Sequence, residues 1–352
     1  MSFAYRDRIL FAEAISFEEI ARRFGTPCYV YSRAEIERNY RAFTQALARR
    51  EALVCYSVKA NSNLAVLALM AKLGAGFDIV SGGELARVEA AGGDPRKVVF
   101  SGVGKSGAEI EQALRAGILC LNLESEEELE RVAAVAGRLG KRAPIAFRVN
   151  PDIDARTHPY ISTGLRSTKF GVPYARAERL YRTAARLRQV TVIGVGCHIG
   201  SQMLDPAPLA AAVQRIAELA DRLTRAGITL QHIDIGGGIG IRYRRERVVP
   251  IGRFAARCVR ALSGRRETLI LDPGRSIVGN AGVLLARIEY VKHTGAKKFL
   301  VVDAAMNDLL RPALYGAWHD VLPVRKKRGK AGVYDVVGPI CESGDFLAQR
   351  RT

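Results

Sequence analysis

A regular alternation of short apolar runs with helix-patterned segments constrains the fold of this chain more than any other feature. The apolar runs are rich in β-branched and aliphatic residues, as buried parallel strands are. Between the runs, apolar residues recur with the period of an amphipathic helix, and several of these segments end in glycine. The apolar runs cover residues 53–58, 76–81, 98–101, 120–124, 145–149, 192–199, 230–235 and 269–272.

Eight strands that alternate with helices predict an α/β fold, a (β/α)8 barrel of the TIM type, with an open doubly wound sheet as the alternative. The rhythm breaks at residues 150–173, a long polar insertion after the fifth strand. In a barrel this insertion follows the carboxyl end of a strand, where loops build the active site.

The pattern changes after Arg275, because segments 283–291, 298–303 and 334–340 predict strands without long helices between them. Residues 28–31 predict one more short strand before the barrel. We therefore expect a barrel domain of residues 35–277 beside a second, mostly β domain. Residues 1–34 and 278–352 would form that second domain together.

The net charge of +19 raises the alternative of a nucleic-acid-binding protein. However, the arginines are spread over helical faces, and only residues 325–330 form a dense basic run. This distribution favours an arginine-rich surface and a small acidic substrate over a nucleic-acid partner.

Membrane, secretion and metal signals are missing from the sequence. No run is long and apolar enough to span a bilayer, and the first residues lack the basic and apolar regions of a signal peptide. The six cysteines are scattered without a Cys-x-x-Cys pair, which argues against a zinc ribbon or a disulfide framework. We therefore expect a cytoplasmic protein with no membrane partner and no metal site.

Lys59 ends the first predicted barrel strand, in the sequence YSVKAN. A lysine at this place points into the mouth of the barrel. Burial there would lower its pKa and free the amine as a nucleophile toward an aldehyde. A lysine at a strand end is weak support by itself, because most such lysines are solvated.

Three consecutive glycines, Gly236, Gly237 and Gly238, follow the seventh strand. Glycines let backbone N–H groups surround a phosphate, and barrels often bind phosphate after strands seven and eight. The spacing does not fit a dinucleotide fingerprint, so it favours a small phosphate monoester.

The ends of the sixth and eighth strands carry further candidates. The imidazole of His198 could stack on a flat cofactor ring, although a lone histidine is more often a core residue. Asp272 could pair with a protonated pyridine nitrogen, and Arg275 suits bidentate capture of a substrate carboxylate. The alternative for this last pair is an internal ion pair across a Pro-Gly turn.

Cys341 follows the predicted strand 334–340 and lies close to Glu342 and Asp345 in sequence. A thiol beside two carboxylates could donate a proton. A free cysteine at a strand end is an equally good interpretation.

Taken in order, these motifs resemble the alanine-racemase-like barrel class of pyridoxal-phosphate enzymes, and within it the bacterial diaminopimelate decarboxylases. The resemblance covers nearly the whole chain and includes GFDIVSGGEL at 76–85, HPYISTGLRSTKF at 158–170 and DAAMNDLLRPALY at 303–315. The second and third of these favour this decarboxylase over ornithine or arginine relatives.

The resemblance implies decarboxylation of meso-2,6-diaminopimelate to L-lysine, the last step of lysine biosynthesis, by a homodimer with shared active sites. Its cofactor would be pyridoxal 5′-phosphate, held by Lys59 as a Schiff base. Asp78 and Arg148 would support the site, His198 would stack on the ring, and Asp272 would pair with the ring nitrogen. The residues around the phosphate would be Ser201, Gly236, Gly237, Gly238, Pro273, Gly274 and Arg275. The substrate would contact Arg275, Arg311, Tyr315 and Glu342, and Cys341 of the partner subunit would donate the proton.

Two features depart from the family. Asp272 stands where relatives have a glutamate, which is one methylene longer, so we expect a stretched or water-mediated bond to the ring nitrogen and weaker activity. The chain also stops soon after Cys341, whereas relatives continue with further strands, so we expect a C-terminally incomplete β domain. The alternatives are a truncated, weakly active or inactive pyridoxal-phosphate-binding barrel, and a decarboxylase of a related diamino acid.

Overall fold

The computed structural model describes residues 2–154, 169–328 and 332–352. The chain divides into two compact units. The larger unit comprises Asn39–Ile241 and Val248–Gly279. The smaller unit comprises the chain up to Arg38, the segment Arg242–Arg247 and the chain from Asn280 onward.

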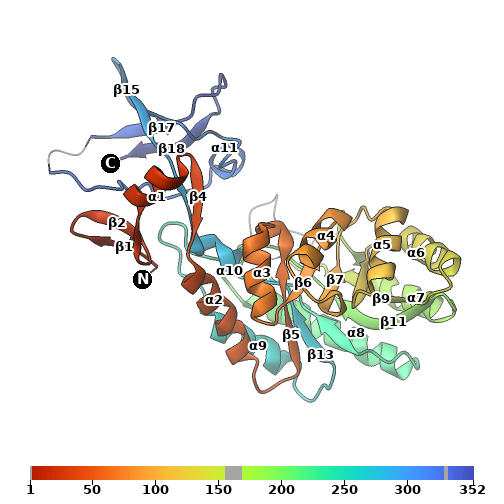
Figure 1. Ribbon diagram of the computed structural model, residues 1–352. Helices are drawn as coiled ribbons and strands as arrows, with labels where there is room; N and C mark the ends of the chain where they lie inside the picture. The colour runs from red at the N-terminus through yellow and green to blue at the C-terminus, as the bar shows by residue number, and fades with distance from the viewer. Residues whose placement is uncertain (1, 155–168, 329–331) are drawn as a thin grey trace. The chain divides into compact units, whose positions relative to one another are not determined.

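Eight parallel strands of the larger unit, counted within its described residues, form a closed barrel (Figure 1). Each strand pairs with the next one along the chain, and the last pairs with the first. All eight coincide with the predicted apolar runs, so the predicted barrel is confirmed and the open sheet is wrong. The strands are β5 (Ala52–Ser57), β6 (Gly76–Ile79), β7 (Val98–Phe100), β8 (Cys120–Leu123), β9 (Ala143–Asn150), β11 (Val190–Gly196), β12 (His232–Asp234) and β13 (Thr268–Leu271).

Serine caps begin several of the helices that follow these strands. Ser81, Ser106 and Ser125 each accept a hydrogen bond from the backbone N–H three residues later, which satisfies a donor that the first helical turn leaves free. The caps fix each helix start just beyond the carboxyl end of a strand. The helices between barrel strands are α3 (Leu64–Lys72), α4 (Gly82–Ala90), α5 (Gly107–Ala116), α6 (Glu126–Arg138), α7 (Tyr174–Ala185), α8 (Ala207–Arg225) and α9 (Ile251–Ala261).

An apolar layer fills the inside of the barrel and supports the residues above it. One side chain from each of six strands contributes, and every one of them is buried, so this layer excludes water. Polar side chains at the carboxyl ends of the strands therefore lie above a buried apolar layer. The layer consists of Cys55, Val99, Cys120, Ala146, Ile193 and Ile270.

The smaller unit is mostly β and is built from both ends of the chain, as predicted (Figure 1). Leu10 and Phe17 from the N-terminal part share one apolar cluster with Leu285 from the C-terminal part. The helix α1 (Phe17–Phe24) lies between β3 and β4 in sequence. The strands are β1 (Phe3–Arg6), β2 (Ile9–Ala12), β3 (Ile15–Ser16), β4 (Cys28–Tyr31), β14 (Gly282–Leu285), β15 (Ile288–Thr294), β16 (Lys297–Val302), β17 (Tyr334–Val337) and β18 (Phe346–Arg351).

The predicted single strand 283–291 is wrong, because the chain changes partner within it. β14 pairs with β4, whereas β15 pairs with β16 in a four-stranded sheet. A run that supplies strands to two different sheets has to bend between them, and its apolar pattern alone does not reveal the bend.

Within the described residues, no helix is both long enough and apolar enough to cross a membrane.

Candidate active site

Lys59 lies in a short 3-10 turn, Val58–Ala60, directly after β5. Its Nζ donates a hydrogen bond of 2.5 Å to Oδ2 of Asp78, which lies one strand away on β6. Ser57 donates to the same carboxylate oxygen at 2.9 Å. Parallel pairing of β5 with β6 places Ser57 opposite Asp78, so the strand register itself builds this contact.

Charge, rather than burial, decides the pKa of Lys59. Partial withdrawal from water would lower the pKa of the ammonium, but the carboxylates of Asp78 and Asp272 outweigh that effect and raise it. The expectation of a depressed lysine pKa is therefore wrong for the chain without a ligand. Burial would raise the pKa of Asp78, but Lys59 and hydrogen bonds from Ser101 and Ser57 lower it, so the two groups form an ion pair.

The turn of Gly236, Gly237 and Gly238 follows β12 and leaves no room for side chains. A Cβ on Gly238 would lie 2.1 Å from the carbonyl oxygen of Gly200, and one on Gly237 would lie 2.5 Å from that of Asp272. Gly236 and Gly238 have φ of +73° and +86°, a region that glycine adopts without strain. The N–H of Gly236 donates to Oδ1 of Asp234, so the N–H groups of Gly237 and Gly238 are the ones that a small anion could approach.

Asp272 and His198 face each other beside this glycine turn. Nδ1 of His198 lies 3.5 Å from Oδ1 of Asp272 and 3.5 Å from the backbone nitrogen of Gly237. Oδ1 of Asp272 is buried and accepts no hydrogen bond from any described residue. A buried carboxylate oxygen without a donor can bind a protonated ring nitrogen.

The turn after β13 is packed against the lysine turn. The backbone N–H of Ser57 donates to the carbonyl oxygen of Pro273 at 3.1 Å, and a Cβ on Gly274 would lie 2.9 Å from Cβ of Ala60. Nη1 of Arg275 donates to Oε1 of Gln202 at 3.3 Å. The structure therefore brings the predicted Pro273, Gly274 and Arg275 close to the Lys59 turn.

Arg148 on β9 is held by two partners at the carboxyl ends of neighbouring strands. Its guanidinium donates to Oε1 of Glu124 at 3.2 Å and to the carbonyl oxygen of His198 at 3.2 Å. The ring of Phe170 lies 4.7 Å from the guanidinium carbon. Arg148 therefore connects β9 with the end of β8 and with the segment that follows β11. Ser201 is partly buried and lies three residues beyond His198.

Asp234 and Asn122 lie beside the glycine turn, although the sequence pattern did not single them out. Oδ1 of Asp234 accepts the N–H of Gly236 at 2.9 Å, and Nδ2 of Asn122 lies 3.3 Å from Oδ2. Burial, followed by the nearby carboxylate of Asp272, raises the pKa of Asp234 well above its ordinary value. The available signal was their position at the carboxyl ends of β12 and β8.

The predicted substrate residues Arg311 and Tyr315 belong to the smaller unit, in α11 (Arg311–Tyr315). The guanidinium carbon of Arg311 lies 5.1 Å from the ring centre of Tyr315. Cys341 and Glu342 are exposed in the same unit, and Oε1 of Glu342 accepts the N–H of Gly344. The structure thus gathers the predicted residues into a barrel group and a smaller-unit group.

Two further parts of the sequence analysis concern the motif at 158–170 and the metal site. Of the motif at 158–170, all but the last two residues lie outside the described residues. Across the described ranges, no group of three or more histidine, cysteine, aspartate or glutamate side chains could hold a metal ion.

Comparison with known proteins gives consistent matches. Residues 33–279 match the family described as pyridoxal-dependent decarboxylase, pyridoxal binding domain. The chain is 58% identical over 350 residues to diaminopimelate decarboxylase of Pseudomonas aeruginosa, and this match covers 99% of the chain and 84% of that relative.

Solved structures give the same picture. Diaminopimelate decarboxylase of Helicobacter pylori, complexed with L-lysine, is 43% identical and superposes with a TM-score of 0.91 over 95% of this chain and 84% of that one. The enzyme of M. jannaschii, in co-complex with L-lysine, is 36% identical and has a TM-score of 0.94, covering 99% of this chain and 84% of that one.

Proposed function

Since this chain belongs to the family of pyridoxal-dependent decarboxylases, we propose that it converts meso-2,6-diaminopimelate to L-lysine and carbon dioxide. The observation that carries the proposal is the identity, over almost the whole chain, to relatives named diaminopimelate decarboxylase. Solved relatives of the same name hold L-lysine, the product of this reaction.

The residues at the barrel mouth fit pyridoxal phosphate. Lys59 offers an amine, the turn Gly236–Gly238 offers a backbone without side chains that a phosphate could approach closely, and Oδ1 of Asp272 lacks a donor among the described residues. These three features suit the aldehyde, the phosphate and the ring nitrogen of that cofactor in turn. When bound, the cofactor supplies a protonated ring that draws electron density away from the carbon that loses its carboxylate.

The barrel residues would hold the reactants in place. Asp78 fixes the Lys59 amine, and the proton of the raised-pKa ammonium has to leave before the nitrogen can bond to an aldehyde. Asp272 would keep a proton on the ring nitrogen, and His198 would cover one face of the ring. Arg148 would support this part of the site through Glu124, and the phosphate would take Ser201, the Gly236–Gly238 turn, Gly274 and Arg275.

The second domain would complete the reaction. We propose that residues 1–34 and 278–352 form it, and that residues 35–277 form the barrel domain. Arg275, Arg311 and Tyr315 would bind the substrate, and Glu342 would lie near its distal amino group. The bond between the α-carbon and the carboxylate breaks, carbon dioxide leaves, and the thiol of Cys341 donates a proton to that carbon. Cys341 would come from the partner of a homodimer in the cytoplasm.

The test is a decarboxylation assay on the purified 352-residue chain loaded with pyridoxal phosphate. We expect equal amounts of L-lysine and carbon dioxide from meso-diaminopimelate. Lys59→Ala should abolish product formation and the visible absorption band of the amine-bound cofactor. Lys72→Ala is the matched control, since Lys72 is exposed on α3 and should retain both.

A panel of substrates separates the alternatives. Turnover of ornithine or another diamino acid without turnover of meso-diaminopimelate would show that the chain is a decarboxylase of that related diamino acid. A cofactor band without release of carbon dioxide from any diamino acid would contradict the proposed activity and leave a cofactor-binding barrel.

A further inference from the structure

A cavity of about 500 Å³ lies outside the barrel mouth, between the segment that precedes α8 and the segment that leads into α9. Cavities of this size can hold a small organic molecule. None of its lining residues belongs to the proposed active site. Its lining comes from three segments, namely Asp205 with Pro206, residues 248–250, and α9 with Arg253, Arg257 and Arg260.

Three arginines make the lining of this cavity positively charged. Arg253, Arg257 and Arg260 are exposed, and within the described part of the chain no hydrogen bond or ion pair holds their side chains. Their spacing of four and three residues places them on one face of α9. Three positive charges held side by side repel one another unless an anion binds among them.

The lining holds one acidic residue, Asp205, against these three arginines. Oδ1 of Asp205 accepts the backbone N–H of Ala207 at 2.9 Å, at the first turn of α8. A carboxylate in this place is already engaged with the amino end of a helix. The lining therefore keeps an excess of positive charge next to a partly apolar wall.

We propose that this cavity is a binding site for an organic di- or triphosphate, such as a nucleoside diphosphate or triphosphate. Guanidinium groups bind phosphate oxygens with paired N–H donors. Arg253 and Arg260 are seven residues apart, which is about 10 Å along the helix. A chain of phosphates matches this spacing better than a single phosphate does, and the valine and proline side chains would accept the organic part.

The position of the cavity separates it from the catalytic phosphate site. The segments that lead into α8 and α9 follow β11 and β12, so they lie at the same end of the barrel as Lys59. The proposed site lies outside the ring of strands, among helices. A ligand there would leave the Gly236–Gly238 turn free for the cofactor, so the inference does not depend on the proposed reaction.

The experiment measures binding of adenosine triphosphate to the full chain loaded with pyridoxal phosphate, by titration calorimetry at physiological salt. Loading occupies the catalytic phosphate site beforehand. We expect saturable binding that weakens about tenfold or more in Arg257→Glu/Arg260→Glu, because two charge-assisted contacts become repulsive.

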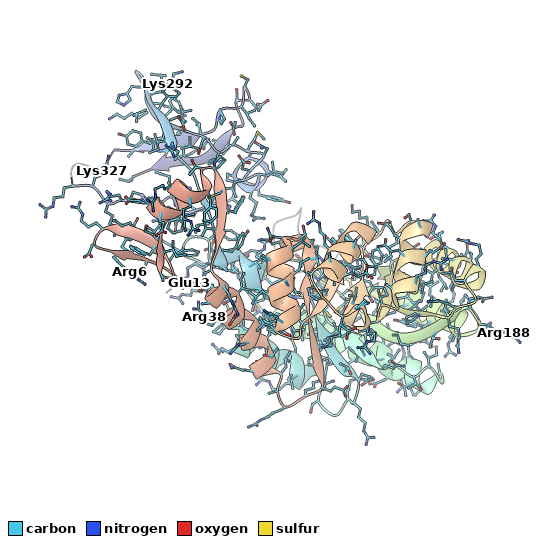
Figure 2. All side chains as sticks on the ribbon, viewed as in Figure 1. Arg6, Glu13, Arg38, Arg188, Lys292 and Lys327 are labelled. Carbon is cyan, nitrogen blue, oxygen red and sulfur yellow. The ribbon has the colours of Figure 1, made fainter. Side chains whose placement is uncertain are left out.

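The matched control is Arg186→Glu/Arg188→Glu, which changes the net charge by the same amount. Both arginines are exposed in the larger unit, and Figure 2 shows Arg188 extending from its surface. The control should bind adenosine triphosphate like the unaltered chain. Equal weakening in both double variants would assign the binding to general surface charge and overturn the proposal. Absence of binding to the unaltered chain would overturn it too.

Discussion

The ion pair between Lys59 and Asp78 should stabilise the barrel as well as serve its chemistry. Lys59→Met removes the charge and keeps a side chain of similar length. Asp78 is fully buried, so the substitution leaves a buried carboxylate without its cation. We expect a loss in the free energy of unfolding of the cofactor-free chain.

The size of this loss follows from the two partners. Breaking a buried ion pair from one side costs about 3–5 kcal/mol. The side chain of Lys59 is 47% exposed, so water screens part of the attraction, and Asp78 keeps its hydrogen bonds from Ser57 and Ser101. We therefore expect a loss of about 2 kcal/mol near neutral pH.

Urea unfolding followed by circular dichroism measures this loss in the larger unit, because helices α3 to α9 belong to it. Trp318, the single tryptophan, belongs to the smaller unit, so its fluorescence tells whether that unit unfolds in the same transition. The matched control is Lys72→Met on the exposed side of α3, which should change the free energy by less than about 0.5 kcal/mol.

The effect should depend on pH in a defined direction. The folded pKa of Asp78 is lowered, so its contribution is full above the unfolded value of about 3.9 and is lost as the pH falls through the folded pKa. The folded pKa of Lys59 is raised, so its contribution is full below about 10.4 and is lost at higher pH. The difference between the unaltered chain and Lys59→Met should be constant from about pH 5 to about pH 9. A difference no larger than that of Lys72→Met would refute the reasoning.

Three further substitutions test other parts of the barrel. Gly238→Ala should weaken pyridoxal phosphate binding about tenfold or more in a fluorescence titration, because its Cβ would collide with Gly200; Gly264→Ala, with φ of +80° and no atom within 4 Å of the Cβ, should not. Asp234→Asn should keep or raise the free energy of unfolding at neutral pH. The pKa of Asp234 is raised in the folded chain, so the contribution of Asp234 to stability is full below its unfolded pKa and is lost as the pH rises through its folded pKa. A loss above about 1 kcal/mol in urea unfolding would contradict this. Lys105→Met should cost about 3–5 kcal/mol, because it removes the buried cation that pairs with Glu128 and that donates to the carbonyl oxygens of Gly102 and Asn122, whereas exposed Arg115→Met should cost less than about 1 kcal/mol.

The barrel was predictable because its strands are buried on both faces. Residues 76–81 and 120–124 are short apolar runs, and glycine or serine caps separate them from the next helix. The hydrophobic periodicity and the helix-cap residues therefore predict the same strand and helix boundaries. The smaller unit was harder, because its strands are partly solvated and change partners. Every residue of β15 is exposed, and its apolar residues share one run with β14, so the sequence did not reveal where the first strand ends.

The site was predictable in composition but not in its contacts. Lys59, the glycine turn and Asp272 stand at strand ends and can be found along the sequence. Asn122 and Asp234 meet across the ring although 112 positions separate them, and only closure of the barrel brings them together. The prediction of a lowered pKa for Lys59 was wrong for the same reason, because both carboxylates that raise this pKa come from other strands.

The balance of charge at the barrel mouth bears on the role proposed for Asp272. Three carboxylates, of Asp78, Asp234 and Asp272, meet there, and Lys59 already pairs with the first. Burial, followed by the carboxylate of Asp272, raises the pKa of Asp234, which favours the uncharged form of Asp234. Oδ1 of Asp272 has no donor among the described residues, and a protonated ring nitrogen would supply one.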